Sequence, residues 1–182
     1  MRVIAGKARR IQLKTIEGLS TRPTTDRIKE TLFNIINFDL ADSTFLDLYA
    51  GSGAIGIEAL SRGAKKAVFV ENNKKAVQCI KDNLVATKLD EQANVITGNV
   101  LDALPDLKGE TFDFVFMDAP YNHGYEKDVL IKLMELELID DNSMIIIEAD
   151  INDDFSYVTD LGYEIHRDKL YKTNRHLFLK KQ

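Results

Sequence analysis

The sequence predicts an α/β fold in which helices cover an open, mostly parallel sheet. Three observations predict it. The apolar run at residues 44–46 is followed by a glycine-rich turn and then by a helical stretch at residues 57–60. The same order of strand, turn and helix repeats along the chain. Residues 144–148 have no polar side chain at their centre, which is typical of a strand buried on both faces of a parallel sheet.

The segment before the glycine-rich turn predicts two smaller elements. Residues 1–14 read as a small hairpin with its turn at residues 6–7. Residues 27–36 carry apolar side chains at helical spacing, and we expect Thr24 or Thr25 to cap the start of that helix.

The rest of the chain alternates between predicted strands and helices. Strands are expected at residues 67–70, 93–97 and 112–117, and helices at residues 74–86 and 126–136. The last two strands, residues 163–167 and 176–179, are joined by a loop that is too short for a crossover helix. We therefore expect seven strands, parallel except for a final antiparallel hairpin.

The glycine-rich turn has the spacing G-x-G-x-x-G at Gly51, Gly53 and Gly56. Glycines after a strand let a ligand approach the backbone, and the following helix points free N–H groups at it. The pattern fits NAD, FAD or S-adenosylmethionine, and alone it does not choose among them.

Polar residues lie at the ends of four predicted strands: Asp47, Glu71, Asn99 and Asp118. In an open α/β sheet the ligand crevice lies at the carboxyl ends of the strands, so we expect these side chains to converge. Glu71 follows Gly51 by 20 residues, the offset at which an acid accepts hydrogen bonds from ribose hydroxyls. Because NAD and S-adenosylmethionine both carry a ribose, Glu71 does not discriminate between them.

Length and composition predict one domain, residues 1–182, without a disulfide or a metal site. The chain is 45% hydrophobic and 29% charged, as in globular proteins. No apolar run approaches the roughly 20 residues of a membrane span, and residues 1–7 turn polar too soon for a signal peptide. The single cysteine, Cys79, falls on an apolar helical stripe and is expected to pack in the core. We expect a cytoplasmic monomer.

The charge is unevenly distributed. The net charge is −5, yet residues 1–29 hold eight basic and two acidic side chains, so this segment is +6 and the remainder is −11. A basic arm on an acidic body suggests a polyanion bound at one place, although a solvated surface explains the charge equally well.

The tetrapeptide Asp118-Ala119-Pro120-Tyr121 follows the fourth strand, opposite the glycine turn. A carboxylate and backbone carbonyls can accept hydrogen bonds from an exocyclic amine, and the Tyr121 ring offers a face on which a base can stack. Hydride transfer needs no such arrangement. The motif therefore favours methyl transfer to an amino group of a planar base.

This motif resembles the Asp-Pro-Pro-Tyr signature of amino methyltransferases, with Ala119 in place of the first proline. Three more stretches, residues 1–6, 22–35 and 47–64, resemble the bacterial family that methylates N2 of guanine 966 in 16S ribosomal RNA. The resemblance runs from Arg2 to the last strand. It implies a Rossmann-like class I methyltransferase fold with S-adenosylmethionine as cofactor, and 16S RNA or a small-subunit assembly intermediate as partner.

The resemblance also implies roles for individual residues. Asp118, Pro120 and Tyr121 would hold the target guanine, with Asp118 accepting from its N2 amino group and Tyr121 stacking on its ring. The cofactor would contact a second set: Arg22, Thr24, Asp47, Ala50, Gly51, Ser52, Gly53, Glu71, Asn72, Asn99 and Val100. The basic arm, residues 1–20, would contact RNA phosphates through Arg2, Lys7, Arg9, Arg10 and Lys14.

The sequence departs from the family pattern at two places, and three alternatives stay open. Ala119 allows the loop more freedom, and Tyr171-Lys172-Thr173 lacks the family's glycine before the final strand. The alternatives are an amino methyltransferase acting on DNA adenine or protein glutamine, an NAD-binding oxidoreductase, and an RNA-binding factor that has lost activity through Ala119.

Overall fold

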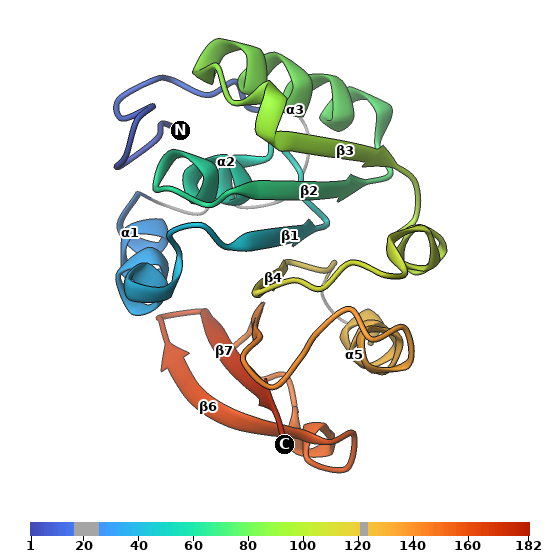
Figure 1. The fold of residues 1–182 in the computed structure, drawn as a ribbon. Coiled ribbons are helices and arrows are strands. Elements are labelled where there is room, and N and C mark those ends of the chain that lie inside the picture. Colours follow the sequence, from blue (N-terminus) through green and yellow to red (C-terminus); the bar gives the residue numbers. More distant parts are fainter. Residues whose placement is uncertain (17–25, 121–123) are drawn as a thin grey trace.

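The computed structural model describes residues 1–16, 26–120 and 124–182, and these form a seven-stranded sheet with helices on both faces (Figure 1). The strand order is β3-β2-β1-β4-β5-β7-β6. The strands are β1 Thr44–Leu48, β2 Lys66–Glu71, β3 Ala93–Thr97, β4 Phe114–Met117, β5 Met144–Asp150, β6 Tyr163–Leu170 and β7 Asn174–Lys181. Neighbouring strands from β3 to β5 are parallel, whereas β7 is antiparallel to both β5 and β6. The predicted fold class is confirmed.

Helices cover the two faces unequally. The helices are α1 Asp26–Ile36, α2 Ala54–Ser61, α3 Lys74–Thr87, α4 Val100–Ala103 and α5 Tyr125–Glu135. Figure 1 shows α1, α2 and α3 on one side of the sheet and α5 on the other. The short helix α4, which the sequence analysis did not predict, packs with α5. Within the described part of the chain, no helix is long and apolar enough to span a membrane.

Two hydrophobic cores lie on either side of the sheet because strand side chains alternate between faces. Phe45 of β1 packs with α1, α2 and α3, while its neighbour Leu46 packs with α4 and α5. Both side chains are fully buried, as are Ile145 and Ile146 of β5 on opposite faces. Each such side chain stabilises the fold by about 1.5–3 kcal/mol relative to an exposed one. The prediction that residues 144–148 are buried on both faces is confirmed.

Of the strands in the described residues, β3 alone has the predicted bounds, and the changes at β1 and β4 bear on the site. β1 continues to Leu48, so Asp47 lies within the strand and not after it. β4 begins only at Phe114, because the preceding Asp113 carboxylate accepts hydrogen bonds from the Thr44 amide at 2.7 Å and the Thr44 hydroxyl at 2.8 Å. This contact ties the starts of β1 and β4 together.

The turn between β6 and β7 closes without the expected glycine. The Tyr171 amide donates to the Asn174 carbonyl at 2.8 Å, and neither Lys172 nor Thr173 has a positive φ. Because no residue of the turn adopts the left-handed conformation, the sequence departure at this point is compatible with the hairpin.

The N-terminal segment is a loop closed by one bridge, between Arg2 and Gln12, so the predicted hairpin is shorter than expected. The turn spans Gly6 to Arg9, where the Arg9 amide donates to the Gly6 carbonyl at 3.2 Å. Gly6 packs directly on α2, since a Cβ there would lie 1.8 Å from the Ser61 carbonyl oxygen. The loop is therefore seated on α2.

A buried carboxylate fixes this loop to the body. Glu58 of α2, fully buried, accepts from the amides of Ile4 at 2.8 Å and Ala5 at 3.0 Å. It also pairs with Lys29 at 3.1 Å and Arg62 at 2.8 Å. Lys29 has no exposed surface and donates in addition to the Arg2 carbonyl at 2.5 Å. Glu58 thus joins the N-terminal loop, α1 and α2 at a single point.

Candidate functional site

The site is built on the loop between β1 and α2. Tyr49 turns the chain out of β1 with φ of 58°, and Gly53 caps the start of α2 with φ of 76°. Gly56, on the first turn of α2, lies against the sheet: a Cβ there would approach the Phe69 ring to 2.4 Å. The third glycine of the motif therefore permits close packing of helix on strand.

Asp47 lies beneath this loop. Its carboxylate is 1% exposed and accepts from the Gly56 amide at 2.9 Å. Burial raises the pKa of Asp47 well above its usual range, and the nearby charges of Asp118 and Glu71 raise it further, although the Gly56 hydrogen bond opposes them. Asp47 therefore braces α2 against β1, and its contact with the cofactor stays a prediction.

Glu71, at the end of β2, lies beside the glycine loop. One carboxylate oxygen accepts from the Gly51 amide at 2.8 Å and the other from the Asn73 amide at 2.8 Å. A carboxylate has about four acceptor positions, so each oxygen retains capacity for a further donor. Glu71 thus holds the loop and can still accept from hydroxyl groups.

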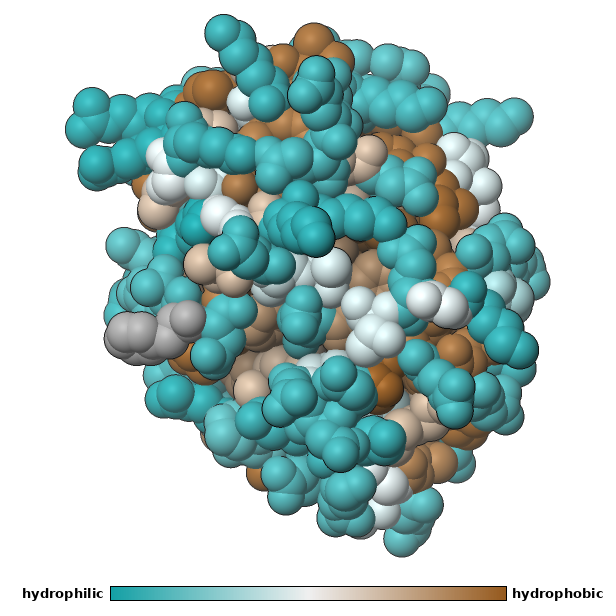
Figure 2. Space-filling view, in the orientation of Figure 1, coloured by the Kyte–Doolittle hydropathy of each residue, from teal (hydrophilic) through white to brown (hydrophobic). Residues whose placement is uncertain are grey.

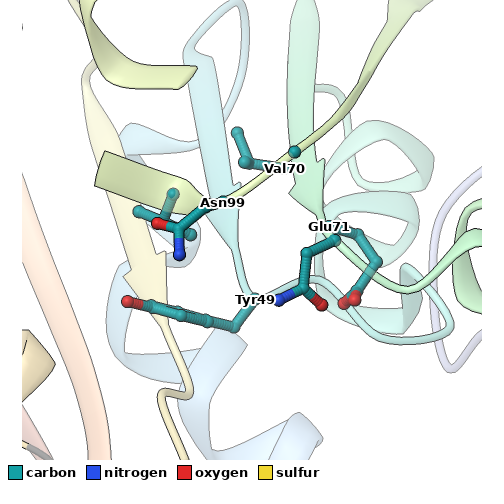
Figure 3. Close-up of a pocket in the computed structure, with 7 residues that line it drawn as sticks. Tyr49, Val70, Glu71 and Asn99 are labelled. Carbon is teal, nitrogen blue, oxygen red and sulfur yellow. The ribbon is translucent and has the colours of Figure 1, made fainter. Parts of the chain in front are cut away.

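A pocket opens where β1, β2 and β3 end (Figure 3). It has an empty volume of about 220 Å³, part of it open to solvent. Its lining consists of Tyr49, Val70, Glu71, Asn72, Gly98, Asn99 and Val100. In Figure 3 the side chains of Tyr49, Glu71 and Asn99 lie around the same space. The predicted convergence of polar strand ends therefore holds for Glu71 and Asn99.

Asn99 also begins α4. Its side-chain oxygen accepts from the Leu101 amide at 3.0 Å, as in an N-cap. This bond fixes the side chain at the mouth of the pocket and places the first turn of α4, with Val100, along one wall. The helix missed by the sequence analysis is thus the element that positions two of the predicted cofactor residues.

Tyr49 is a lining residue that the sequence analysis missed. Its ring is half-buried and stacks on Tyr125 of α5, with centroids 6.4 Å apart and an interplanar angle of 27°. Burial raises the pKa of Tyr49 to about 12, and the Glu126 carboxylate contributes. The sequence did hold a signal for Tyr49. An aromatic side chain between a strand and a glycine turn lies at the end of the sheet, where the ligand crevice is expected. Val70 and Gly98 were missed as well.

The other predicted cofactor residues fall into two groups. Ala50, Gly51, Ser52 and Gly53 form the loop itself, with the Gly53 amide donating to the Ala50 carbonyl at 2.7 Å. Arg22 and Thr24, together with the N-cap candidate Thr25, lie outside the described residues.

The residue predicted to accept from the target amine, Asp118, follows β4 and is partly buried. Burial raises its pKa to about 8, and the carboxylates of Glu148 and Glu126 add to the effect. The next residue, Ala119, is 2% exposed, and Pro120 is exposed. Tyr121 lies outside the described residues. The structure thus places a basic carboxylate at the end of the strand beside β1.

The five basic residues predicted to contact RNA behave differently from one another. Arg2 pairs with Asp26 at 2.9 Å and Lys14 with Asp82 at 2.8 Å, while Lys7 donates to Gln92. Arg9 and Arg10 are exposed, and neither forms an ion pair with any residue that the structure describes. On the face seen in Figure 2, hydrophilic side chains extend over the end of the molecule where Figure 1 places the N-terminal loop and α3.

Known proteins share this fold and sequence. A family model described as conserved hypothetical protein 95 matches residues 1–180. Ribosomal RNA small subunit methyltransferase D of Haemophilus influenzae is 39% identical over 152 residues, which cover 82% of this chain and 79% of that protein. The Escherichia coli K12 protein of the same name is 33% identical over 170 residues, covering 93% of this chain and 84% of that protein.

A solved structure agrees with the sequence relatives. The Escherichia coli protein yhhF superposes with a TM-score of 0.89 at 32% identity, and the match covers 100% of this chain and 98% of that one. The likeness therefore includes the N-terminal loop and the final hairpin as well as the central sheet. The chain belongs to the family of the ribosomal RNA small subunit methyltransferase D proteins, as the sequence resemblance predicts.

Proposed function

We propose that this chain is an S-adenosylmethionine-dependent methyltransferase that methylates the exocyclic N2 of guanine 966 in 16S ribosomal RNA. The names of its relatives support the reaction class and the RNA. The observation that carries the proposal is the placement of two carboxylates, Glu71 and Asp118, at the ends of the strands that flank β1. The glycine loop lies between them.

The pocket residues fit an adenosine group. Val70, Val100 and the Tyr49 ring supply apolar surface for a flat base, and Asn99 supplies polar atoms at its edge. Glu71 supplies the acceptor for ribose hydroxyls. The volume, about 220 Å³, is below the roughly 300 Å³ of the smallest typical ligand sites, so the pocket fits the nucleoside end and the methionine end would extend over the glycine loop.

When bound, S-adenosylmethionine supplies an electrophilic methyl group, so the protein has mainly to align the target amine. Asp118 accepts a hydrogen bond from the guanine amino group and thereby directs the nitrogen lone pair away from itself. It then takes the proton that the methylated nitrogen releases. With a pKa of about 8, Asp118 is ionised and can take this proton mainly above about pH 8, where it is a stronger base than an ordinary aspartate.

The target base has to leave its stack to reach Asp118, and Pro120 and Tyr121 would hold it there. The N-terminal loop would contribute affinity through phosphate contacts, chiefly from Arg9 and Arg10. The ion pairs of Arg2 and Lys14 are exposed, and such pairs contribute only about 0–1 kcal/mol, so phosphates can replace the carboxylates. We further propose a cytoplasmic monomer that acts on 16S RNA or on a small-subunit assembly intermediate.

One experiment tests the reaction. Purified protein would be incubated with tritium-labelled S-adenosylmethionine and small-subunit particles that lack the modification, and the RNA would be mapped by nuclease digestion and mass spectrometry. We expect N2-methylguanine at position 966, and none with Asp118→Ala. A methyl group on adenine or on protein would redirect the proposal, and RNA binding without transfer would indicate an inactive factor.

Calorimetric titration measures cofactor binding independently of methyl transfer. S-adenosylhomocysteine is expected to bind wild type and Asp118→Ala with similar affinity, because Asp118 does not line the nucleoside pocket. NADH is expected not to bind. Tight NADH binding would instead support an oxidoreductase.

A further inference from the structure

A row of polar side chains crosses the sheet beside the proposed catalytic carboxylate. Met117 of β4 pairs with Ile147 of β5, so Asp118 and Glu148 are the next residues along these parallel neighbours. Glu148 in turn pairs with His176 of β7. Residues at matching register project to the same face of a sheet, so Glu148 and His176 share a face, and Asp118 follows the last paired residue of β4 beside them.

The far end of this row is fixed. Glu148 is 5% exposed and His176 is fully buried. One Glu148 oxygen lies 3.1 Å from His176 Nε2, and the other accepts from the Asn174 side-chain nitrogen Nδ2 at 2.8 Å. The second ring nitrogen of His176 lies 3.3 Å from the Tyr171 hydroxyl. The imidazole also packs edge-on to the Phe116 ring, with centroids 6.2 Å apart.

The Asn174 side-chain amide donates to Glu148, and the His176 ring faces the other Glu148 oxygen with Nε2 and the Tyr171 hydroxyl with Nδ1. Burial raises the pKa of Tyr171 to about 12, and Glu148 contributes, so this hydroxyl keeps its proton. The network therefore fixes the position of the Glu148 carboxylate.

We propose that Glu148, held by His176 and Asn174, is a positioning residue for methyl transfer: its fixed charge makes Asp118 the group that accepts the amino proton. The proposal rests on the function proposed above. In the step concerned, a proton leaves the methylated nitrogen of the base and binds a carboxylate oxygen of Asp118. The positive charge on the nitrogen and the negative charge on Asp118 disappear together, which relieves the repulsion between Asp118 and Glu148.

The groups that act on Asp118 come from every neighbouring element. Glu148 acts from β5 and Glu126 from the first turn of α5. Asp47 of β1 is coupled to Asp118 from the other side. Burial is the largest cause of the raised pKa of Asp118, and the Glu148 carboxylate contributes more to it than the Glu126 carboxylate does.

The test uses the protein without cofactor or RNA. Carbon-13 NMR of labelled carboxyl groups would follow the titration of Asp118 in wild type, Glu148→Gln and Glu148→Asp. Glu148→Gln keeps the shape and removes the charge, so we expect the Asp118 midpoint to fall by about one pH unit or more. Glu148→Asp keeps the charge and should restore most of the wild-type midpoint. Glu164→Gln, an exposed change on β6, is the matched control.

Kinetics gives the second measurement. The acidic limb of the kcat profile should move to lower pH in Glu148→Gln, with a lower plateau because Asp118 is then a weaker base. A purely structural role for Glu148 would lower kcat without moving the limb. An unchanged Asp118 titration in Glu148→Gln would overturn the proposal.

Wild type alone can overturn the proposal even if Glu148→Gln does not fold. An Asp118 midpoint below about 5 in wild type, close to the ordinary value of about 3.9, would do so. Because the titration needs no substrate, its outcome is independent of the proposed reaction. A midpoint that falls in Glu148→Gln, without guanine methylation, would leave the coupling in place and reject only the target.

Discussion

Replacing Glu58 by Gln should release the N-terminal loop and destabilise the whole protein. The Glu58 carboxylate accepts from two loop amides and pairs with two cations, Lys29 and Arg62. A glutamine has one acceptor oxygen, and its amide hydrogens would face donors. The side chain would keep its volume, so any effect arises from charge and hydrogen bonding and not from a cavity.

The magnitude follows from burial. Lys29 and Glu58 have no exposed surface, and burial already lowers the pKa of Lys29 although the Glu58 charge opposes that shift. Breaking a buried pair on one side leaves an uncompensated charge and costs about 3–5 kcal/mol. The free energy of unfolding of a domain is about 5–15 kcal/mol. The Glu58→Gln protein should therefore remain folded at 25 °C, with a much lower free energy of unfolding than wild type.

Urea unfolding followed by circular dichroism would measure this loss. The control is Glu30→Gln on α1, an exposed site where we expect a change within about 0.5 kcal/mol. Adding Lys29→Met to Glu58→Gln removes the second charge as well and should recover part of the stability. A loss below about 1 kcal/mol in Glu58→Gln, or no recovery in the double variant, would refute the reasoning.

Three further predictions concern the site and the loop. Glu71→Ala should weaken S-adenosylhomocysteine binding by about 1–3 kcal/mol in calorimetry, and an unchanged Kd would remove Glu71 from the site. Changing Arg9 and Arg10 together to Ala should reduce the slope of log K for RNA binding against log salt concentration by about one to two units. An unchanged slope would mean that neither arginine contacts a phosphate. Asp118→Asn should gain stability over wild type as pH rises from about 4 to 8, because the folded state holds the Asp118 proton up to a pKa of about 8 and the unfolded state releases it near 3.8. If the difference in unfolding free energy between Asp118→Asn and wild type stayed constant across that pH range, the prediction would be wrong.

The fold could be predicted because its signals are local. Apolar runs, the glycine turn and the short loop before residues 176–179 define strands and their directions without knowledge of packing. The place of Glu71 and Asn99 in the pocket followed from the same signals, since both residues come at the ends of parallel strands. Tyr49 did not follow, because its place in the pocket depends on a positive φ and on stacking against Tyr125, 76 positions later in the chain.

The buried ionic contacts could not be predicted for a different reason. Lys29 counts as one of eight basic side chains in residues 1–29, and charge alone assigns it to the surface. Only the packing of α1 on α2 brings it to Glu58 and removes it from the surface. Glu148 and His176 likewise meet only through the register of β5 and β7. Sequence patterns report which side chains a strand or helix presents, whereas the pairing of two charges from distant elements is decided by how those elements pack. Glu148, which we propose tunes Asp118, belongs to this second kind, so only the structure links the proposed catalytic carboxylate to the final hairpin.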